Sequence, residues 1–291
     1  IVAANGKTRL FMRVPSRIKA VAQSMLYGQH PDIEFLDAAD YINSMPPTYE
    51  NIQEIGLDIA GVELSLAKES VYPIATYESF ESKEGDERII DSMSILLELL
   101  GKLKFNETVW MQFLMAPASE EHQKKSLQIV KEMKAKAQTQ GEISGVISQR
   151  SPGEELRMKM LEKKASQPGF ETLIRYIYFA PKDQMNIDMA YSGLAAYFNQ
   201  FSTDQNSFRK NVKTFTLVSP FFFPYFFPKK RLLIRKKLIL AAYRSREMTE
   251  ATFLGKFLEG GFWSRVPFNR LARVLAAQEL ATIFHMTTDV V

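Results

Sequence analysis

The chain has 291 residues, which is enough for roughly two domains. Its apolar fraction of 46% and charged fraction of 24% exclude a disordered or fibrous protein. It contains no cysteine, which excludes disulfides and thiolate metal sites and suits a reducing compartment.

The net charge of +4 is distributed unevenly along the chain. Between Asp32 and Asp91 there are 15 acidic and three basic residues, so the remainder is strongly basic. We expect an acidic surface on the first half and a basic one on the second, either as solvated faces or as a functional polarity. The chain begins at Ile1 without a methionine, so we expect it to be part of a longer polypeptide.

The N-terminal region predicts a strand–helix–strand unit. The apolar residues 9–14 are typical of a strand, and Pro15 would end it because proline has no amide proton for a ladder. Ser16 is a suitable N-cap for a helix over residues 16–28, which has an apolar stripe. Residues 33–36 would return as the second strand.

After a polar connector over residues 40–55, the pattern predicts a second such unit. Residues 57–67 alternate as a strand, and residues 71–77 are its expected partner. Four residues of the first strand share one face: Ala60, Val62, Leu64 and Leu66. An amphipathic helix over residues 88–103 and an apolar strand over residues 108–115 complete the unit.

Two successive strand–helix–strand units are typical of a ferredoxin-like sandwich, in which helices cover one face of an antiparallel sheet. We therefore predict an α/β (α+β) fold whose first ferredoxin-like module spans residues 1–117. Residues 118–167 then predict a protruding helical arm, because the helical stretches 120–138 and 154–165 are highly charged and carry few large apolar residues.

We expect the segment 168–201 to form the unit around which the rest of the chain is organised. A Pro168-Gly169 turn leads into a strand over residues 172–180, which is rich in Ile, Tyr and Phe and ends at Pro181. A helix over residues 186–201 follows, with an apolar stripe that can lie back on this strand.

A second α/β module over residues 168–291 is the economical interpretation of what remains. The further predicted elements are a strand over 212–218, helices over 229–246 and 249–259, and a final helix over 278–285 after an apolar stretch at 271–275. The interpretation depends on a repeated pattern, an apolar strand halted by proline, at residues 10–15, 109–117 and 175–181.

No catalytic, cofactor-binding or metal-binding residue can be assigned from motifs. Gly6-Lys7-Thr8 lacks the earlier glycine and the preceding strand of a phosphate-binding loop, so a turn before the first strand is favoured. The histidines His30, His122 and His285 lack ligand spacing, and His285 could cap the end of its helix. Neither a signal peptide nor a membrane-spanning helix is expected within this chain.

The most unusual composition lies in residues 221–237, here called the basic–aromatic segment. Its aromatic and cationic residues are candidates for contact with nucleic acid or lipid: Phe221, Phe222, Phe223, Tyr225, Lys229, Lys230, Arg231, Arg235, Lys236 and Lys237. Rings stack on unpaired bases while cations hold the backbone, and the same pair of residue types suits a membrane interface. Alternatively, the rings fill a gap between modules and the cations solvate a helix whose leucines are buried.

Several stretches resemble a known family in order and spacing: R-L-F-M-R-V-P followed by Y-G-Q-H-P-D-I-E-F, V-W-M-Q-F-L-M-A-P, P-G-F-E-T-L-I-R-Y-I-Y-F-A-P-K, and Q-E-L-A-T-I-F-H-M. The chain is similar to the amino-terminal, pre-motor region of bacterial type IV secretion and conjugation-type DNA-transfer ATPases, the coupling-protein relatives. Residues 278–285 resemble the element just ahead of the motor domain.

The resemblance implies a non-catalytic assembly or docking module of a DNA-translocating ATPase, with ATP and Mg expected only in a downstream motor domain. It implies a cytoplasmic position at the inner face of the cell membrane. Expected partners are further copies of the chain or secretion-channel proteins, with DNA and an anionic membrane surface as candidates for the basic helix. The alternative is a stand-alone nucleic-acid-binding or membrane-peripheral interaction protein.

Overall fold

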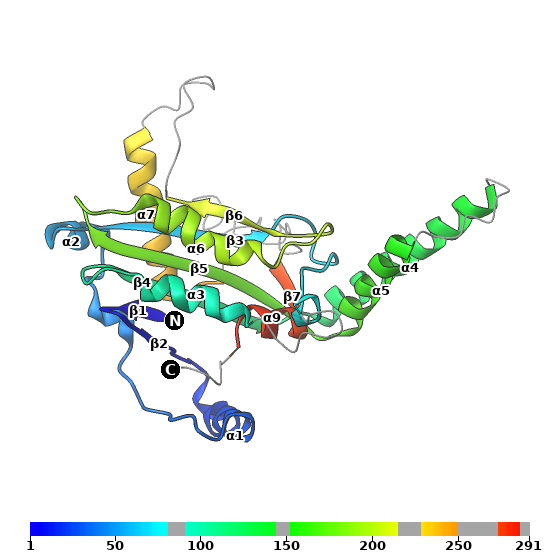
Figure 1. Ribbon diagram of the computed structural model, residues 1–291, viewed down its shortest axis with the longest axis horizontal. Coiled ribbons are helices and arrows are strands. Elements are labelled where there is room, and N and C mark those ends of the chain that lie inside the picture. Colours follow the sequence, from blue (N-terminus) through cyan, green and yellow to red (C-terminus); the bar gives the residue numbers. More distant parts are fainter. Residues whose placement is uncertain (81–90, 144–151, 215–227, 249–272, 286–291) are drawn as a thin grey trace.

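In the part of the chain that the structure describes, seven antiparallel strands form one sheet in the order β2-β1-β4-β5-β3-β6, with β7 paired to one end of β5 (Figure 1). In this computed structural model, the described residues are 1–80, 91–143, 152–214, 228–248 and 273–285. The strands are β1 (Val2–Ala4), β2 (Lys7–Arg9), β3 (Leu57–Leu66), β4 (Thr108–Pro117), β5 (Gly169–Pro181), β6 (Phe208–Lys213) and β7 (Val274–Ala276).

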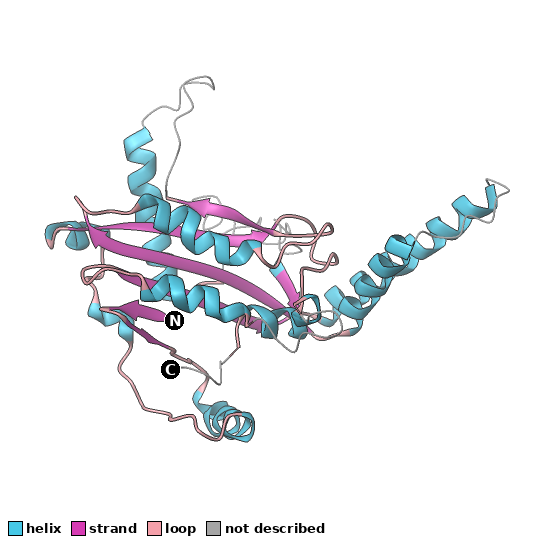
Figure 2. Ribbon diagram, in the orientation of Figure 1, coloured by secondary structure: helices cyan, strands magenta, loops and turns pink. Residues whose placement is uncertain are grey.

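Helices cover both faces of the sheet, whereas the helices of the arm extend away from it (Figure 2). The α-helices are α1 (Lys19–Gln29), α2 (Tyr49–Glu54), α3 (Ser92–Gly101), α4 (Glu120–Ile143), α5 (Pro152–Ser166), α6 (Leu194–Asn199), α7 (Pro228–Ser245) and α9 (Ala277–Ile283). Short helical turns of other types are η1 (Ser16–Ile18), η2 (Tyr41–Ser44), η3 (Tyr77–Ser79) and the π-helix η4 (Met189–Gly193).

One face of the sheet packs under α3, α6 and α9. The alternating residues of β3 predicted to share a face all lie in this core: Ala60, Val62, Leu64 and Leu66. Met93 and Leu96 of α3 and Phe198 of α6 close over them, as their helical spacing predicted. The Tyr176 hydroxyl donates a hydrogen bond to the Ala190 carbonyl at 2.8 Å and thereby ties the helical segment back to β5.

The opposite face packs under α2 and α7. Trp110 of β4 and Phe179 of β5 meet edge to face there, with ring centroids 4.7 Å apart. Ile239 and Tyr243 of α7 cover them. Because both faces of the central strands are buried, β3, β4 and β5 carry large apolar residues in both phases of the alternation.

A row of polar side chains crosses the centre of this second face. Glu63, Arg175 and Gln112 stand opposite one another on β3, β5 and β4. Arg175 Nε lies 2.9 Å from Glu63 Oε2, and its Nη1 donates to the Ala242 carbonyl. Gln112 donates to the Tyr243 carbonyl. The row therefore satisfies carbonyls at the C-terminal end of α7, where a cation also complements the helix dipole.

The predicted mixed α/β fold is confirmed, whereas a pair of ferredoxin-like modules is not. β5, assigned from the sequence to the second module, lies between β4 and β3 of the first and pairs with both over most of its length. An alternating apolar pattern predicts a strand but not the strands that pair with it. Two short sheets and one large sheet were therefore equally compatible with the sequence.

The first strands begin earlier in the chain than the predicted strand at 9–14. β1 and β2 form a hairpin whose turn residues Asn5 and Gly6 have φ angles of 53° and 70°. Residues with positive φ at both turn positions are typical of tight hairpins. The turn at Gly6 is therefore confirmed, but a strand does precede it, and residues 10–15 are not in a strand.

Two further predicted strands, 33–36 and 71–77, have no strand structure. In and beside 71–77, several backbone groups are bonded by side chains instead of a neighbouring strand. Glu279 accepts from Ile74 N, and Thr282 accepts from Tyr77 N. The Asn206 amide donates to the carbonyls of Glu69 and Tyr72. Apolar composition favoured a strand here because those distant partners are invisible in the local sequence.

The remaining helices largely confirm their predictions. The prediction of a polar connector over residues 40–55 is wrong, because η2 and α2 form within it. The predicted helix 249–259 lies outside the described residues, as do residues 215–218 of the predicted strand 212–218.

The charged arm is present as two adjacent helices, α4 and α5, which project together from one end of the sheet (Figure 1). Lys134 on α4 and Glu162 on α5 form an ion pair at 2.5 Å. Where the arm meets the body, Val130, Leu161 and Ala165 form a small separate core with Val71. The arm is thus apolar at its base and charged beyond it.

Candidate functional site

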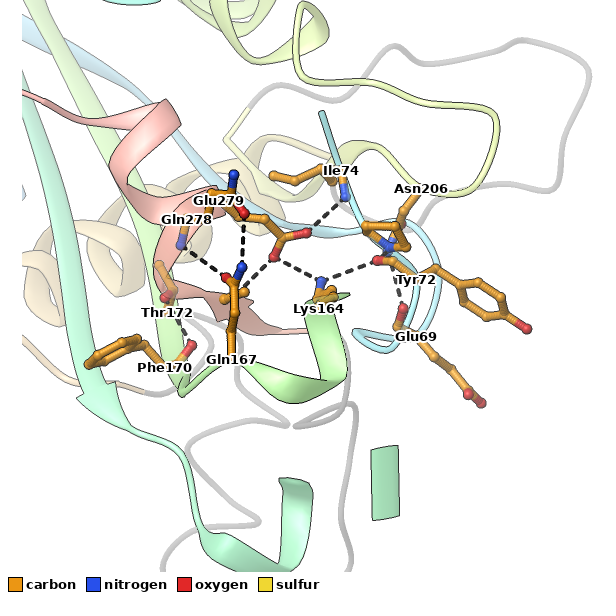
Figure 3. A network of polar contacts seen from close by, with 12 residues as sticks. Glu69, Tyr72, Ile74, Lys164, Gln167, Phe170, Thr172, Asn206, Gln278 and Glu279 are labelled. Atoms are coloured by element: carbon orange, nitrogen blue, oxygen red, sulfur yellow. Dashed lines mark hydrogen bonds and ion pairs between the residues drawn. The ribbon is translucent and has the colours of Figure 1, made fainter. Parts of the chain in front are cut away.

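The most site-like cluster of polar groups lies at the base of the arm (Figure 3). Lys164, in the last turn of α5, places its Nζ atom 2.9 Å from Glu279 Oε2 on α9. The two side chains are 8% and 2% exposed. Lys164 Nζ also donates to the Tyr72 carbonyl at 3.2 Å. We call the Lys164–Glu279 pair the arm clamp.

Glu279 is satisfied from several directions. Its Oε1 accepts from Ile74 N at 2.9 Å, and its Oε2 accepts from Ala276 N at 2.8 Å. The second bond is the reach of a third-position glutamate back to the start of its own helix. Both carboxylate oxygens of Glu279 therefore have hydrogen-bond partners, although the group is buried.

Burial lowers the pKa of Lys164, and the Glu279 carboxylate opposes that effect. The ammonium group is held between a carboxylate and a carbonyl, both within hydrogen-bond distance. A lysine held in this way is suited to locking two helices together rather than to attacking a substrate.

Partly exposed polar contacts surround the arm clamp. Gln167 donates to Gln278 at 2.8 Å, and Gln278 donates to Glu78 at 3.0 Å. Glu78 also pairs with Lys163. α5 and α9 are therefore joined by a layer of contacts, of which only the arm clamp is closed off from water.

A cavity of about 310 Å³ lies beside the arm clamp, between the base of the arm and the ends of β4, β5 and β7. Lys164, Ser70 and Gln123 are among its lining residues. The Ser70 hydroxyl is buried and has no hydrogen-bond partner among the described residues. The cavity therefore lies where the arm meets the sheet, next to the arm clamp.

The basic–aromatic segment is only partly within the described residues. Phe221, Phe222, Phe223 and Tyr225 lie outside them. Lys229 and Lys230 are exposed in the first turn of α7, and Arg231 follows in the helix.

The later cations of this segment lie against acidic neighbours. Lys236 Nζ is 2.6 Å from Asp58 Oδ1, and its ammonium group stands 5.5 Å from the centre of the Tyr49 ring. Lys237 pairs with Glu50, and Arg235 is half-buried. These contacts attach α7 to α2 and β3, so at Lys236 and Lys237 the charge has a packing role.

The three histidines lie on separate elements. His30 follows α1, His122 lies on α4 and His285 follows α9. His285 Nε2 lies 2.7 Å from Asp91 Oδ1, which also accepts from Met93 N at the start of α3. His285 therefore contacts the beginning of a different helix instead of capping its own. Among the described residues, no group of acidic or histidine side chains could hold a metal ion.

Within the part of the chain that the structure describes, no helix is both long and apolar enough to cross a membrane.

The arm clamp was not predicted from the sequence. The only local signal was Glu279 at the third position of a helix, since nothing in a single sequence links it to Lys164.

A family model described as a domain of unknown function (DUF8128) matches residues 2–219, roughly three quarters of the chain. The match includes β1 to β6 and the arm with Lys164, and it ends before α7 and α9. No curated protein and no solved structure matches the chain.

Proposed function

Because the chain belongs to the DUF8128 family of domains of unknown function, we propose its role from its geometry: it is an assembly and docking module in which the arm and α9 act as one unit. The proposal assigns binding rather than catalysis to this chain. The proposal builds on the similarity of the chain to the pre-motor region of conjugation-type DNA-translocating ATPases.

The observation that carries the proposal is the arm clamp. Surface ion pairs contribute little to stability, typically about 0–1 kcal/mol. Removing one member of a buried pair costs about 3–5 kcal/mol, because it leaves an uncompensated charge in the core. With side chains 8% and 2% exposed, the clamp belongs to the second class, so it resists separation of α5 from α9.

The direction of coupling follows from the topology. The arm projects from the body, and α9 is the last described helix before the end of the chain (Figure 1). In the DNA-transfer ATPases that the chain resembles, the stretch corresponding to α9 lies just ahead of the motor domain. A partner that binds the arm would therefore act on the segment leading to that motor.

In this role the protein works in the cytoplasm at the inner face of the cell membrane, as part of a type IV secretion or conjugation machine. Its partners are further copies of the chain or secretion-channel proteins. ATP and Mg are used by a downstream motor domain. Lys229 and Lys230, exposed in the first turn of α7, are the residues that contact DNA.

The first test uses the natural full-length protein. We expect its reading frame to continue past Val291 into a G-x-x-x-x-G-K-[ST] segment, and we expect the purified protein to hydrolyse ATP. The 291-residue chain alone should not hydrolyse ATP. A natural protein without a nucleotide-binding motor, or hydrolysis by the isolated chain, would contradict the proposal.

The second test measures coupling of the arm to the body. The chain lacks cysteine, so spin labels can be attached at introduced Leu156→Cys on α5 and Phe105→Cys before β4, both at exposed positions. We expect a narrow distance distribution that broadens when Lys164→Met removes the clamp. Lys159→Met is the matched control, because its ion pair with Glu155 is exposed.

DNA contact is tested by binding measured against salt, since phosphate contacts make affinity fall steeply as salt rises. Lys229→Glu with Lys230→Glu should reduce binding, whereas Lys124→Glu with Lys125→Glu on the arm should not. Absence of binding at low salt to both single and double strands would remove DNA from the proposal and leave the docking role.

A further inference from the structure

The helix α1 is held away from the sheet by the segments on either side of it. It lies beyond β2, the edge strand, on the opposite side of the molecule from the N-terminal end of α7 (Figure 1). None of its residues is buried. The helix therefore contributes nothing to either core, although its sequence has the apolar stripe of a packed helix.

Three residues of this stripe are exposed large hydrophobics: Ile18, Val21 and Met25, at 43%, 56% and 69%. Their spacing of three and four residues puts them on one face of the helix. Leu10 and Met12, in the segment leading to the helix, are also exposed. We call these five residues, which lie on α1 and in the segment before it, the α1 stripe.

Cations flank the stripe, and residues 1–31 contain no acidic residue. Arg17 and Lys19 immediately precede and follow Ile18, where η1 meets α1, so they lie on either side of it around the helical turn. Arg9 directly precedes Leu10 and Arg13 directly follows Met12, and both arginines are exposed. Cations on both flanks of an apolar stripe are the arrangement of helices that lie in a membrane interface.

The other side of α1 contacts the segment that follows the helix. Tyr27, about half a turn around from the stripe, meets the Phe35 ring edge to face with centroids 4.9 Å apart. Lys19 pairs with Asp37 at 2.6 Å. The returning segment thus supports the helix from behind and leaves the stripe facing outward.

Acidic residues follow α1 and would oppose an anionic partner if they faced it. Asp37 is paired with Lys19, and Asp40 is held by the Arg246 guanidinium, which lowers the pKa of Asp40 against the opposing effect of burial. Asp32 and Glu34 lie in the returning segment, after the helix. Within residues 9–25, which hold the stripe, every charged residue is a cation.

We propose that the α1 stripe and its flanking cations dock this protein on an anionic phospholipid surface. The apolar side chains enter the headgroup region, while Arg9, Arg13 and Arg17 contact lipid phosphates. This surface is separate from the cations at the start of α7 and does not depend on the proposed assembly role.

A second copy of the chain is a weaker candidate for the occupant. An 11-residue helix is only about 16 Å long, and a stable protein interface buries about 800 Å² on each partner. Five side chains with cations among them fall short of that area, and two such faces would bring like charges together.

The test is sedimentation of the 291-residue chain with vesicles of phosphatidylcholine, alone or mixed with phosphatidylglycerol. We expect binding to the mixed vesicles only, weakening as salt rises. Val21→Glu with Met25→Glu should reduce this binding at least about tenfold, and Arg13→Gln with Arg17→Gln should do the same. These positions are exposed, so the fold should be retained, as circular dichroism can verify.

Matched controls are Leu156→Glu, an exposed apolar residue of α5, and Lys124→Gln with Lys125→Gln on α4. Both should bind as the unchanged chain does. The proposal is overturned if the unchanged chain ignores mixed vesicles at low salt, or if the stripe variants bind normally. It is also overturned if the chain is a dimer in solution that these variants dissociate, since the stripe would then face a second copy.

Discussion

Glu63 on β3 and Arg175 on β5 face each other at the centre of the sheet and form an ion pair with no exposure to solvent. The same guanidinium donates to the Ala242 carbonyl near the end of α7. A second guanidinium, that of Arg273, lies 3.9 Å from the other oxygen of Glu63. One buried pair thus connects two central strands with the helix that covers them.

Replacing Arg175 alone should be strongly destabilising. Arg175→Met leaves the Glu63 carboxylate without its main partner, and we expect the free energy of unfolding to fall by about 3–5 kcal/mol. The double replacement Glu63→Met with Arg175→Met should recover most of this loss, although the Ala242 carbonyl still lacks its donor. Urea unfolding of the single and double variants measures the difference. Losses that simply add would contradict this account.

Gly61 on β3 is required by the close approach of α7. A β-carbon there would lie 2.9 Å from Ile239 Cδ1 and 3.0 Å from its Cγ2. We expect Gly61→Ala to lower the free energy of unfolding by about 1–3 kcal/mol through overpacking. Adding Ile239→Val, which removes Cδ1, should restore part of it.

Gly101→Ala is the control, because a β-carbon at Gly101 meets nothing within 4 Å. It should leave stability unchanged or raise it slightly, since alanine favours helix over glycine. If both glycine variants unfold at the same urea concentration as the unchanged chain, α7 does not pack on β3 as described.

Buried tyrosines predict a loss of stability at high pH. Burial raises the pKa of Tyr191 to about 12 and raises the pKa values of Tyr176, Tyr197 and Tyr243 above the usual 10.0. Between pH 10 and 12 the unfolded chain therefore binds fewer protons than the folded one, so the free energy of unfolding falls as pH rises.

Phenolate absorbance followed together with circular dichroism checks this prediction. The buried tyrosines should ionise in the same transition that unfolds the protein, after the exposed ones have titrated. Ionisation of all tyrosines near pH 10 with the fold intact would show that these hydroxyls are open to solvent.

Single elements of the fold were predictable where one local pattern decides the outcome. The alternation of β3 placed Ala60, Val62, Leu64 and Leu66 on one face, and all four lie in one core. The charged character of α4 and α5 predicted an arm, because a helix with few large apolar residues cannot be covered all round. By contrast, residues 71–77 have a strand-like composition, yet their amides bond to Glu279 and Thr282 instead.

The amino-acid sequence alone determined the long core strands β3, β4 and β5, the helices α3, α6 and α7, and the face that β3 presents, because hydrophobic periodicity is a local property. Only the tertiary structure decided that β5 enters the sheet between β4 and β3, that α1 keeps its apolar stripe outside, and that Lys164 meets Glu279. These outcomes depend on which distant surfaces come together, and the free energy of such contacts arises only once the chain has folded.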